Sequence, residues 1–157
     1  MSEPQIYVDA DACPVKDEAV RVAMRHRLTI TLVANQGSRP TRDPMIRYVY
    51  VPYGPDAADD WIVEQLTAND IVITSDIPLA SRALELGAQV LGPSGKRFTP
   101  EGIGMAMAMR QLKQHLRESG EIRDHHPEFS ARDRSQFLSA FDEVVTRAKR
   151  QAQQTSV

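Results

Sequence analysis

The chain has a single cysteine, Cys13, and no apolar run that approaches the roughly 20 residues needed by a membrane-spanning helix. One cysteine excludes an intrachain disulfide and a zinc site built from several thiolates. The N-terminal residues also lack the basic segment and apolar core of a secretory signal. From these absences we expect a cytoplasmic protein with no membrane partner.

The length and composition of the chain suit one globular domain. The 157 residues are 41% hydrophobic and 25% charged, enough for a sizeable buried core. With no internal repeat or linker in view, we expect a single domain over residues 1–150 and a frayed tail at 151–157. The net charge of -2 conceals a net -5 over residues 1–95 and a net +3 over residues 96–157. A surplus of +3 by itself favours a solvated helical face over a nucleic-acid surface.

Short apolar runs alternate with amphipathic segments through the first two thirds of the chain. This alternation is typical of a three-layer α/β fold with a mostly parallel sheet, here of about five strands. The predicted strands cover residues 6–8, 28–34, 46–51, 70–74 and 89–91, and the predicted helices cover residues 15–26, 56–66 and 78–86.

The last third of the chain predicts two additional helices. The first covers residues 100–117, and the second begins at Ser130, where Ser130 and Asp133 have the spacing of a capping box. We expect both helices to pack on the same core as the sheet. Three methionines of the first helix are predicted to fill that core: Met105, Met107 and Met109.

Acidic residues recur at three equivalent points of the predicted fold. Asp9 and Asp11 follow the first strand, Asp59 and Asp60 lie in the first turn of a helix, and Asp76 lies two residues beyond another buried strand. The carboxyl ends of parallel strands meet at one edge of the sheet. If the first and fourth strands are neighbours, the first and third clusters meet there and the second leans over them.

Carboxylates brought this close repel one another, and a hard divalent cation is the usual resolution. Oxygen ligands with no nearby Cys or His select Mg²⁺ or Mn²⁺ over zinc. Such a metal can activate water and offset charge on a phosphodiester transition state. We therefore predict a metal held by Asp9, Asp76 and one of Asp59 or Asp60, with Asp11 as an additional or outer ligand.

Three stretches carry a family resemblance: residues 8–16 (VDADACPVK), 56–62 (DAADDWI) and 73–80 (ITSDIPLA). Together with a C-terminal pattern, they resemble the YaiI/YqxD family of bacterial proteins, itself similar in fold to PIN-like metal-dependent nucleases. The C-terminal residues that share this resemblance are Gly95, Arg110, Arg117, Gly120, Phe129, Asp133, Arg134 and Phe137.

The resemblance implies a three-layer PIN-like (Rossmann-like) fold and a nuclease that acts on RNA or DNA with Mg²⁺ or Mn²⁺. Asp9, the pair Asp59 and Asp60, and Thr74 with Asp76 are similar to the acids and the Thr-x-Asp of the PIN pattern. Asp11 is an addition to that pattern. The residues expected to contact substrate phosphates are Lys16, Ser38, Arg39, Thr74, Arg110, Arg117 and Arg134.

Two other functions remain open. The Asp9-Ala10-Asp11 sequence mimics the nucleophile motif of haloacid dehalogenase-type phosphatases, with Asp9 as the nucleophile. That motif set needs a lysine and a different order of segments, which disfavours it here. The other alternative is a nucleic-acid-binding or regulatory protein that keeps a PIN-like cradle without catalysis.

Each conspicuous residue also has a structural interpretation. A single aspartate near a helix start is often only its cap, and Asp11, Asp59 or Asp60 could each serve that purpose. Cys13 is better explained as a small packing residue than as a nucleophile, because the acids beside it disfavour a thiolate. The pair His125 and His126 lies in a polar segment and is expected to be solvated.

Overall fold

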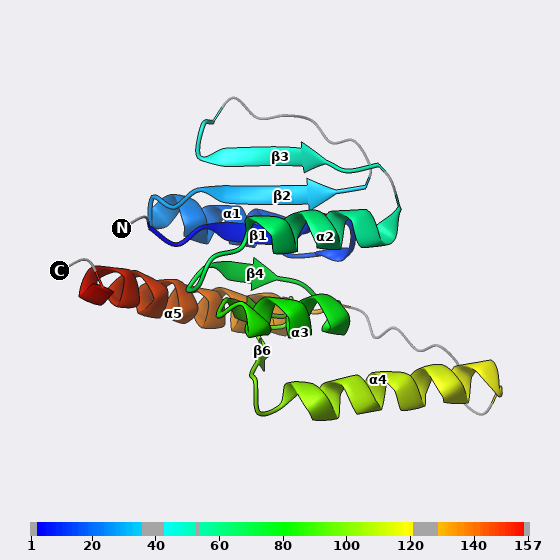
Figure 1. Ribbon diagram of the computed structural model, residues 1–157. Helices are drawn as coiled ribbons and strands as arrows, with labels where there is room; N and C mark the ends of the chain where they lie inside the picture. Colours follow the sequence, from blue (N-terminus) through cyan, green and yellow to red (C-terminus); the bar gives the residue numbers. More distant parts are fainter. Residues whose placement is uncertain (1–2, 36–42, 53, 121–128, 156–157) are drawn as a thin grey trace.

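One six-stranded sheet forms the centre of the protein (Figure 1). The computed structural model describes residues 3–35, 43–52, 54–120 and 129–155. The strand order is β3-β2-β1-β4-β5-β6, and every neighbouring pair is parallel except β5 and β6. The strands are β1 (Ile6–Asp9), β2 (Ile30–Ala34), β3 (Ile46–Tyr50), β4 (Ile71–Ile73), β5 (Gln89–Leu91) and β6 (Arg97–Phe98).

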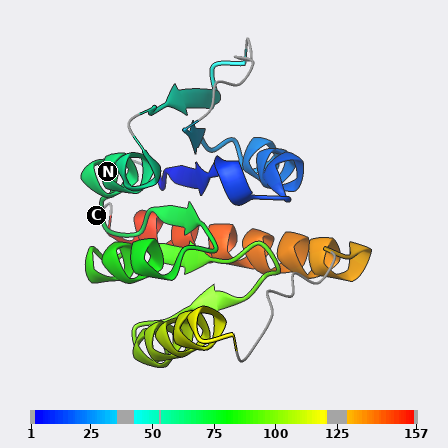
Figure 2. The same ribbon diagram turned by 90° about the vertical axis from the view of Figure 1, so that its right-hand side faces the viewer.

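Helices cover both faces of the sheet. The described helices are the 3₁₀ turn η1 (Ala10–Ala12), α1 (Lys16–Arg25), α2 (Pro55–Gln65), α3 (Ile77–Glu85), α4 (Ile103–Glu118) and α5 (Ala131–Thr155). Figure 2 shows α1 and α5 on one side of the sheet and α2 and α3 on the other, with α4 beyond them. The chain therefore has a three-layer, Rossmann-like α/β fold, as the alternation of segments predicts.

The central strands are apolar because both of their faces are covered. β2 and β4 are buried along their whole length, as expected of strands inside a parallel sheet. All five predicted strands are present. The sequence did not predict β6, since two residues are too few to produce a pattern.

Helix α5 completes the core on the α1 side. Phe137 and Phe141 are fully buried, and their rings stack with centroids 5.3 Å apart. The predicted capping box at the start of α5 is confirmed, because Asp133 N donates to Ser130 Oγ and Ser130 N donates to Asp133 Oδ2. The helix continues to Thr155, beyond the expected onset of fraying at 151.

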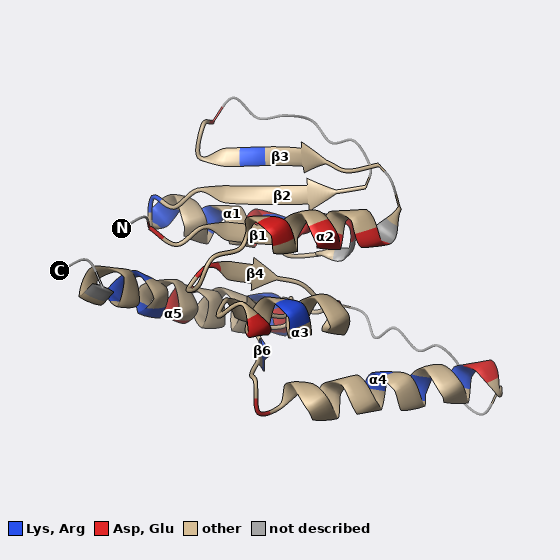
Figure 3. Cartoon of the chain, viewed as in Figure 1, with Lys and Arg blue, Asp and Glu red and all other residues tan. Residues whose placement is uncertain are grey.

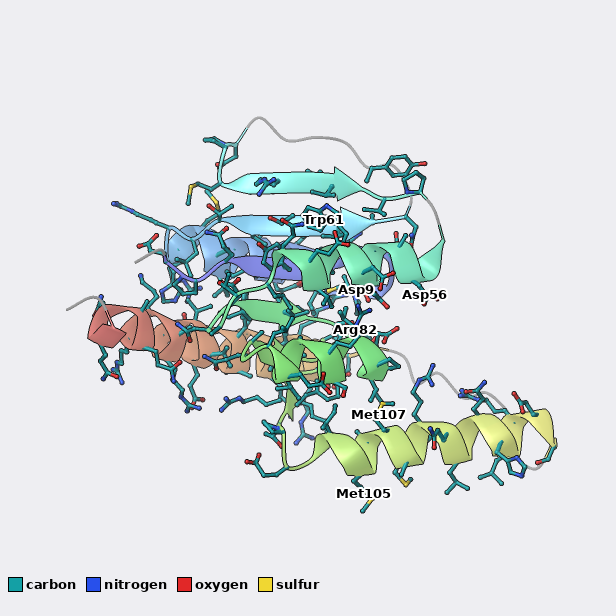
Figure 4. The ribbon with its side chains drawn as sticks, in the orientation of Figure 1. Asp9, Asp56, Trp61, Arg82, Met105 and Met107 are labelled. Carbon is teal, nitrogen blue, oxygen red and sulfur yellow. The ribbon has the colours of Figure 1, made fainter. Side chains whose placement is uncertain are left out.

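Helix α4 differs from the prediction. None of its residues is buried, Met105 is 70% exposed, and Met109 and Leu112 are also exposed. Figure 4 shows Met105 pointing away from the rest of the molecule. The assignment of Met105 and Met109 to the core was therefore wrong, while Met107 is half-buried. A helical apolar stripe does not indicate whether another layer is present to cover it.

Gly95 in the β5–β6 turn is expected to tolerate no side chain. Its φ of +90° disfavours L-residues, and a Cβ there would lie 2.8 Å from the Gln136 carbonyl oxygen. Gly95→Ala should therefore lower the free energy of unfolding by about 1–3 kcal/mol in urea titrations. Gly104→Ala is the matched control, because a Cβ at Gly104 meets nothing within 4 Å. The control should stabilise α4, and an equal loss in both variants would contradict the explanation.

Candidate functional site

The pairing of β1 with β4 places Asp9 next to Thr74. Val8 lies opposite Ile73 in this parallel pair, so the next residues of the two strands also lie side by side. Thr74 Oγ1 donates to Asp9 Oδ2 over 3.0 Å, and Asp76 N donates to Thr74 Oγ1 over 2.9 Å. The buried Thr74 hydroxyl, 1% exposed, thus connects the first acidic cluster to the third.

Asp76 has a structural role at the same place. It is the N-cap of α3, and its Oδ1 accepts a hydrogen bond from Leu79 N over 2.9 Å. This bond orients the carboxylate and satisfies one free N–H group of the first helical turn. Asp76 therefore caps a helix, a role that the sequence pattern suggested for Asp11, Asp59 or Asp60 instead, and its charge also acts on the neighbouring acids.

Asp59 of α2 is the most perturbed acid of the group. Burial, followed by the charges of Asp76, Asp9 and Asp56, raises its pKa to about 7, and Arg82 opposes the shift. Figure 4 shows Asp9, Asp56 and Arg82 in the region where α2 faces α3. Asp59 is therefore close to half-protonated at neutral pH, which is rare for an aspartate.

Asp9 shares the same environment. Burial raises its pKa first, and the charges of Asp76 and Asp11 raise it further, while the hydrogen bond from Thr74 lowers it. Asp9, Asp59 and Asp76 therefore form one electrostatically coupled group, called here the carboxylate cluster. Its members come from β1, α2 and the β4–α3 connection. The prediction that Asp59 and Asp60 lie in the first turn of their helix was wrong, because α2 begins at Pro55 and its first-turn acid is Asp56.

Two predicted acids make other contacts. Asp60 Oδ1 accepts from Arg82 Nη1 over 2.7 Å, and both side chains are about half exposed. Asp11 is exposed, and its Oδ2 accepts from Asn35 N over 2.7 Å. Asn35, which the sequence analysis overlooked, also donates through Nδ2 to Val51 O over 2.9 Å. Asp11 thus holds the end of β2 beside η1, at the margin of the carboxylate cluster.

The donor chemistry of the carboxylate cluster suits a hard divalent cation. All of its donors are carboxylate oxygens, and their mutual repulsion would be relieved by a cation. In the part of the chain that the structure describes, however, no three His, Cys, Asp or Glu side chains are already grouped to hold a metal ion. Metal binding would therefore require these side chains to move closer together.

The remaining candidates are dispersed. Cys13 is buried, and burial raises the pKa of its thiol to about 11, which favours the packing interpretation. Lys16 is exposed at the start of α1. Arg134 donates to Pro14 O over 2.8 Å and pairs with Glu18 over 3.0 Å, so it ties α5 to α1.

Arg110 and Arg117 are exposed on α4, far along the chain from the acids, and they line a cleft between α4 and the β5–β6 turn. Two other candidates, Ser38 and Arg39, lie outside the described residues, as does the histidine pair that was expected to be solvated, His125 and His126.

Asp59→Asn is expected to stabilise the protein above neutral pH. Because folding raises the pKa of this carboxyl from 3.8 to about 7, the folded state binds its proton more tightly than the unfolded state. The resulting stability is complete below pH 3.8 and is lost as pH rises through 7. The free energy of unfolding of the variant should exceed that of the unmodified chain by on the order of 1 kcal/mol at pH 8, a value reduced for solvent screening, and by less at pH 4.5.

Urea unfolding at the two pH values measures this effect. Glu64→Gln removes the same charge from an exposed position on α2 and should change stability little at either pH. A gain for Asp59→Asn that is the same at pH 4.5 and pH 8 would contradict the assigned cause.

A family model described as "Uncharacterized BCR, YaiI/YqxD family" matches residues 7–147 of the chain, a span that contains the whole carboxylate cluster. The chain belongs to the YaiI/YqxD family. This confirms the family predicted from the three sequence stretches. The PIN-like assignment stays a prediction.

Full-length relatives agree with this membership. UPF0178 protein mlr0875 of Mesorhizobium japonicum is 59% identical over 152 residues, which cover 97% of this chain and 98% of the relative. UPF0178 protein Atu1478 of Agrobacterium fabrum is 58% identical over 147 residues, or 94% and 96% of the two chains. No solved structure shows significant similarity to this YaiI/YqxD protein. Among its described residues, no helix is long and apolar enough to cross a membrane.

Proposed function

We propose that this YaiI/YqxD protein is a phosphodiesterase that uses Mg²⁺ or Mn²⁺ to cleave RNA or DNA at the carboxylate cluster. The observation that supports this function is the grouping of Asp9, Asp59 and Asp76 at one edge of the sheet, where burial and the charge of Asp76 raise the pKa of both Asp9 and Asp59. Acids with raised pKa values of this kind concentrate at functional sites.

The contacts favour Asp59 over Asp60 as the third metal ligand. Asp60 is already paired with Arg82, whereas the pKa of Asp59 is raised by the nearby charges of Asp76 and Asp9. The Thr74 hydroxyl donates to the Asp9 carboxylate and accepts from the backbone N–H of Asp76, so its main role is to position these residues rather than to bind phosphate. We therefore assign the ligand set to Asp9, Asp59 and Asp76.

The cation and the residues that hold it would have different roles. A Mg²⁺ or Mn²⁺ ion held by Asp9, Asp59 and Asp76 would supply positive charge that offsets the negative charge of a phosphodiester transition state. The bond from Leu79 N fixes the orientation of the Asp76 carboxylate, and the Thr74 hydroxyl fixes that of Asp9. Both carboxylates would have to shift toward Asp59 to hold the ion.

The proposal is tested with a labelled single-stranded RNA incubated with the purified full chain. We expect cleavage with Mn²⁺ and no cleavage with EDTA, together with Mn²⁺ binding by calorimetry. Absence of both would refute the proposal. RNA retention that survives EDTA, without cleavage in Mn²⁺, would instead support the non-catalytic binding protein. Turnover of a chromogenic phosphomonoester would support the phosphatase alternative.

A further inference from the structure

A basic cleft of about 760 Å³ lies between α4, the β5–β6 turn and the start of α3. Five cationic residues line it: Lys96, Arg97, Arg110, Lys113 and Arg117. No acidic residue is found in this lining within the described part of the chain. Figure 3 shows the positive segments of α4 on one side of the molecule and the acidic segments of α2 on another. The cleft therefore attracts anions although the whole chain has a net negative charge.

The helix contributes its cations as a row. Arg110, Lys113 and Arg117 follow one another at helical spacings of three and four residues, so they share one face of α4. Seven residues of helix extend about 10 Å, which is longer than one phosphate group. Within the described residues, the side chains of Lys96, Arg110 and Lys113 form no ion pair. The row is thus suited to a ligand with successive phosphates.

Apolar side chains line the same cleft beside the cations. Ile77, Phe98 and Met109 all contribute, and Phe98 comes from the edge strand β6. A duplex presents its phosphates outward and keeps its bases stacked inside, so its base faces cannot contact apolar side chains. Single strands expose base faces that pack on aromatic and apolar side chains next to a positive groove. The mixed lining therefore favours a single strand over a duplex.

The cleft also borders the carboxylate cluster. Ser75 and Ile77, the two chain neighbours of Asp76, both line it. A strand that follows the cations of α4 toward α3 therefore arrives beside Asp76. This continuity distinguishes the cleft from an ordinary solvated face of a basic helix.

We propose that the cleft between α4 and the β5–β6 turn binds the phosphate backbone of single-stranded nucleic acid and leads it to Asp76. This inference rests on the proposed function for the chemistry at Asp76, but the binding itself needs no catalysis. Arg110 and Lys113 are the central phosphate contacts, and Phe98 and Met109 supply the surface for the bases.

The test measures the fluorescence anisotropy of a short fluorescein-labelled oligothymidylate with the full chain in EDTA, over a range of KCl concentrations. The double variant Arg110→Gln/Lys113→Gln should bind roughly tenfold more weakly, and its slope of log affinity on log salt should be about 1.4 smaller. The double variant Arg21→Gln/Arg150→Gln removes the same charge from exposed positions on α1 and α5. This control should bind within about twofold of the unmodified chain.

Several outcomes would overturn the inference. They are no binding by the unmodified chain, equal weakening in both double variants, or competition by a duplex as effective as that by the single strand. Thermal unfolding of each variant verifies that the fold is retained.

The same variants separate this inference from the proposed function. If only the α4 double variant loses binding while the unmodified chain never cleaves with Mn²⁺, the cleft is supported and the proposed function fails. If cleavage occurs and the α4 double variant binds as the unmodified chain does, the cleft fails and the proposed function stands.

Discussion

Replacing Asp9 with asparagine should reduce Mn²⁺-dependent cleavage by at least about 10²–10³-fold, the range seen when one group that stabilises transition-state charge is removed. Asparagine keeps an oxygen that can accept the hydrogen bond from Thr74 Oγ1, so the contact between β1 and the β4–α3 connection is retained. The substitution removes the negative charge that a divalent cation requires. The loss should therefore fall on metal binding and rate rather than on folding.

Cleavage rates at saturating RNA and Mn²⁺ titrations of the same preparations measure this effect. Asp17→Asn is the matched control, because Asp17 is exposed on α1 and outside the carboxylate cluster. It should cleave as the unmodified chain does. Full activity of Asp9→Asn would mean that cleavage comes from another site or from a contaminating nuclease.

The Mn²⁺ affinity of the unmodified chain should increase about tenfold per pH unit well below pH 7, and roughly 50-fold between pH 5 and pH 7, if one proton with a pKa of about 7 leaves as the ion binds. The pKa of Asp59 is raised to about 7, so below that pH this ligand is mostly protonated and must lose its proton first. Above pH 7 the carboxylate is already ionised, and the affinity should level off. Calorimetry in two buffers with different ionisation enthalpies measures the released proton directly.

The variant Asp59→Asn isolates the source of this dependence. It should bind Mn²⁺ more weakly at pH 7.5 and show a flatter pH profile, with the remaining slope due to Asp9, whose pKa is also raised. Glu64→Gln, exposed on the same helix, should leave the profile unchanged. An affinity that stays constant from pH 5 to pH 7 would exclude Asp59 as a ligand that ionises on binding.

The position of the carboxylate cluster was predictable because it depends on periodic local patterns. Apolar runs of β-forming residues define β1 and β4, and in parallel strands the residues that follow both runs must reach one edge of the sheet. The neighbouring arrangement of β1 and β4 confirms the geometry assumed for Asp9 and Asp76. The capping box at Ser130 and Asp133 was predictable for the same reason, since its contacts span only three residues.

Other features depend on partners that are distant in sequence. Asp59 and Asp60 are adjacent and chemically identical, and a helical pattern cannot tell them apart. Arg82, 22 residues from Asp60 in the chain, pairs with Asp60, while Asp59 remains with the other acids. The exposure of Met105 likewise depends on the absence of a covering layer beside α4 in the described structure, which the spacing of methionines does not encode.

The sequence by itself therefore determined the alternation of strands and helices, the membership of the family, and the edge of the sheet at which Asp9 and Asp76 lie. These follow from short-range periodicity and from the geometry common to parallel sheets. Only the tertiary structure decided that Asp59 is the acid whose pKa is raised to about 7 and that the Thr74 hydroxyl links Asp9 to Asp76. It also decided that α4 lines a basic cleft beside Asp76. Burial and long-range electrostatics arise from the packing of residues far apart in the chain, and local patterns carry little information about them.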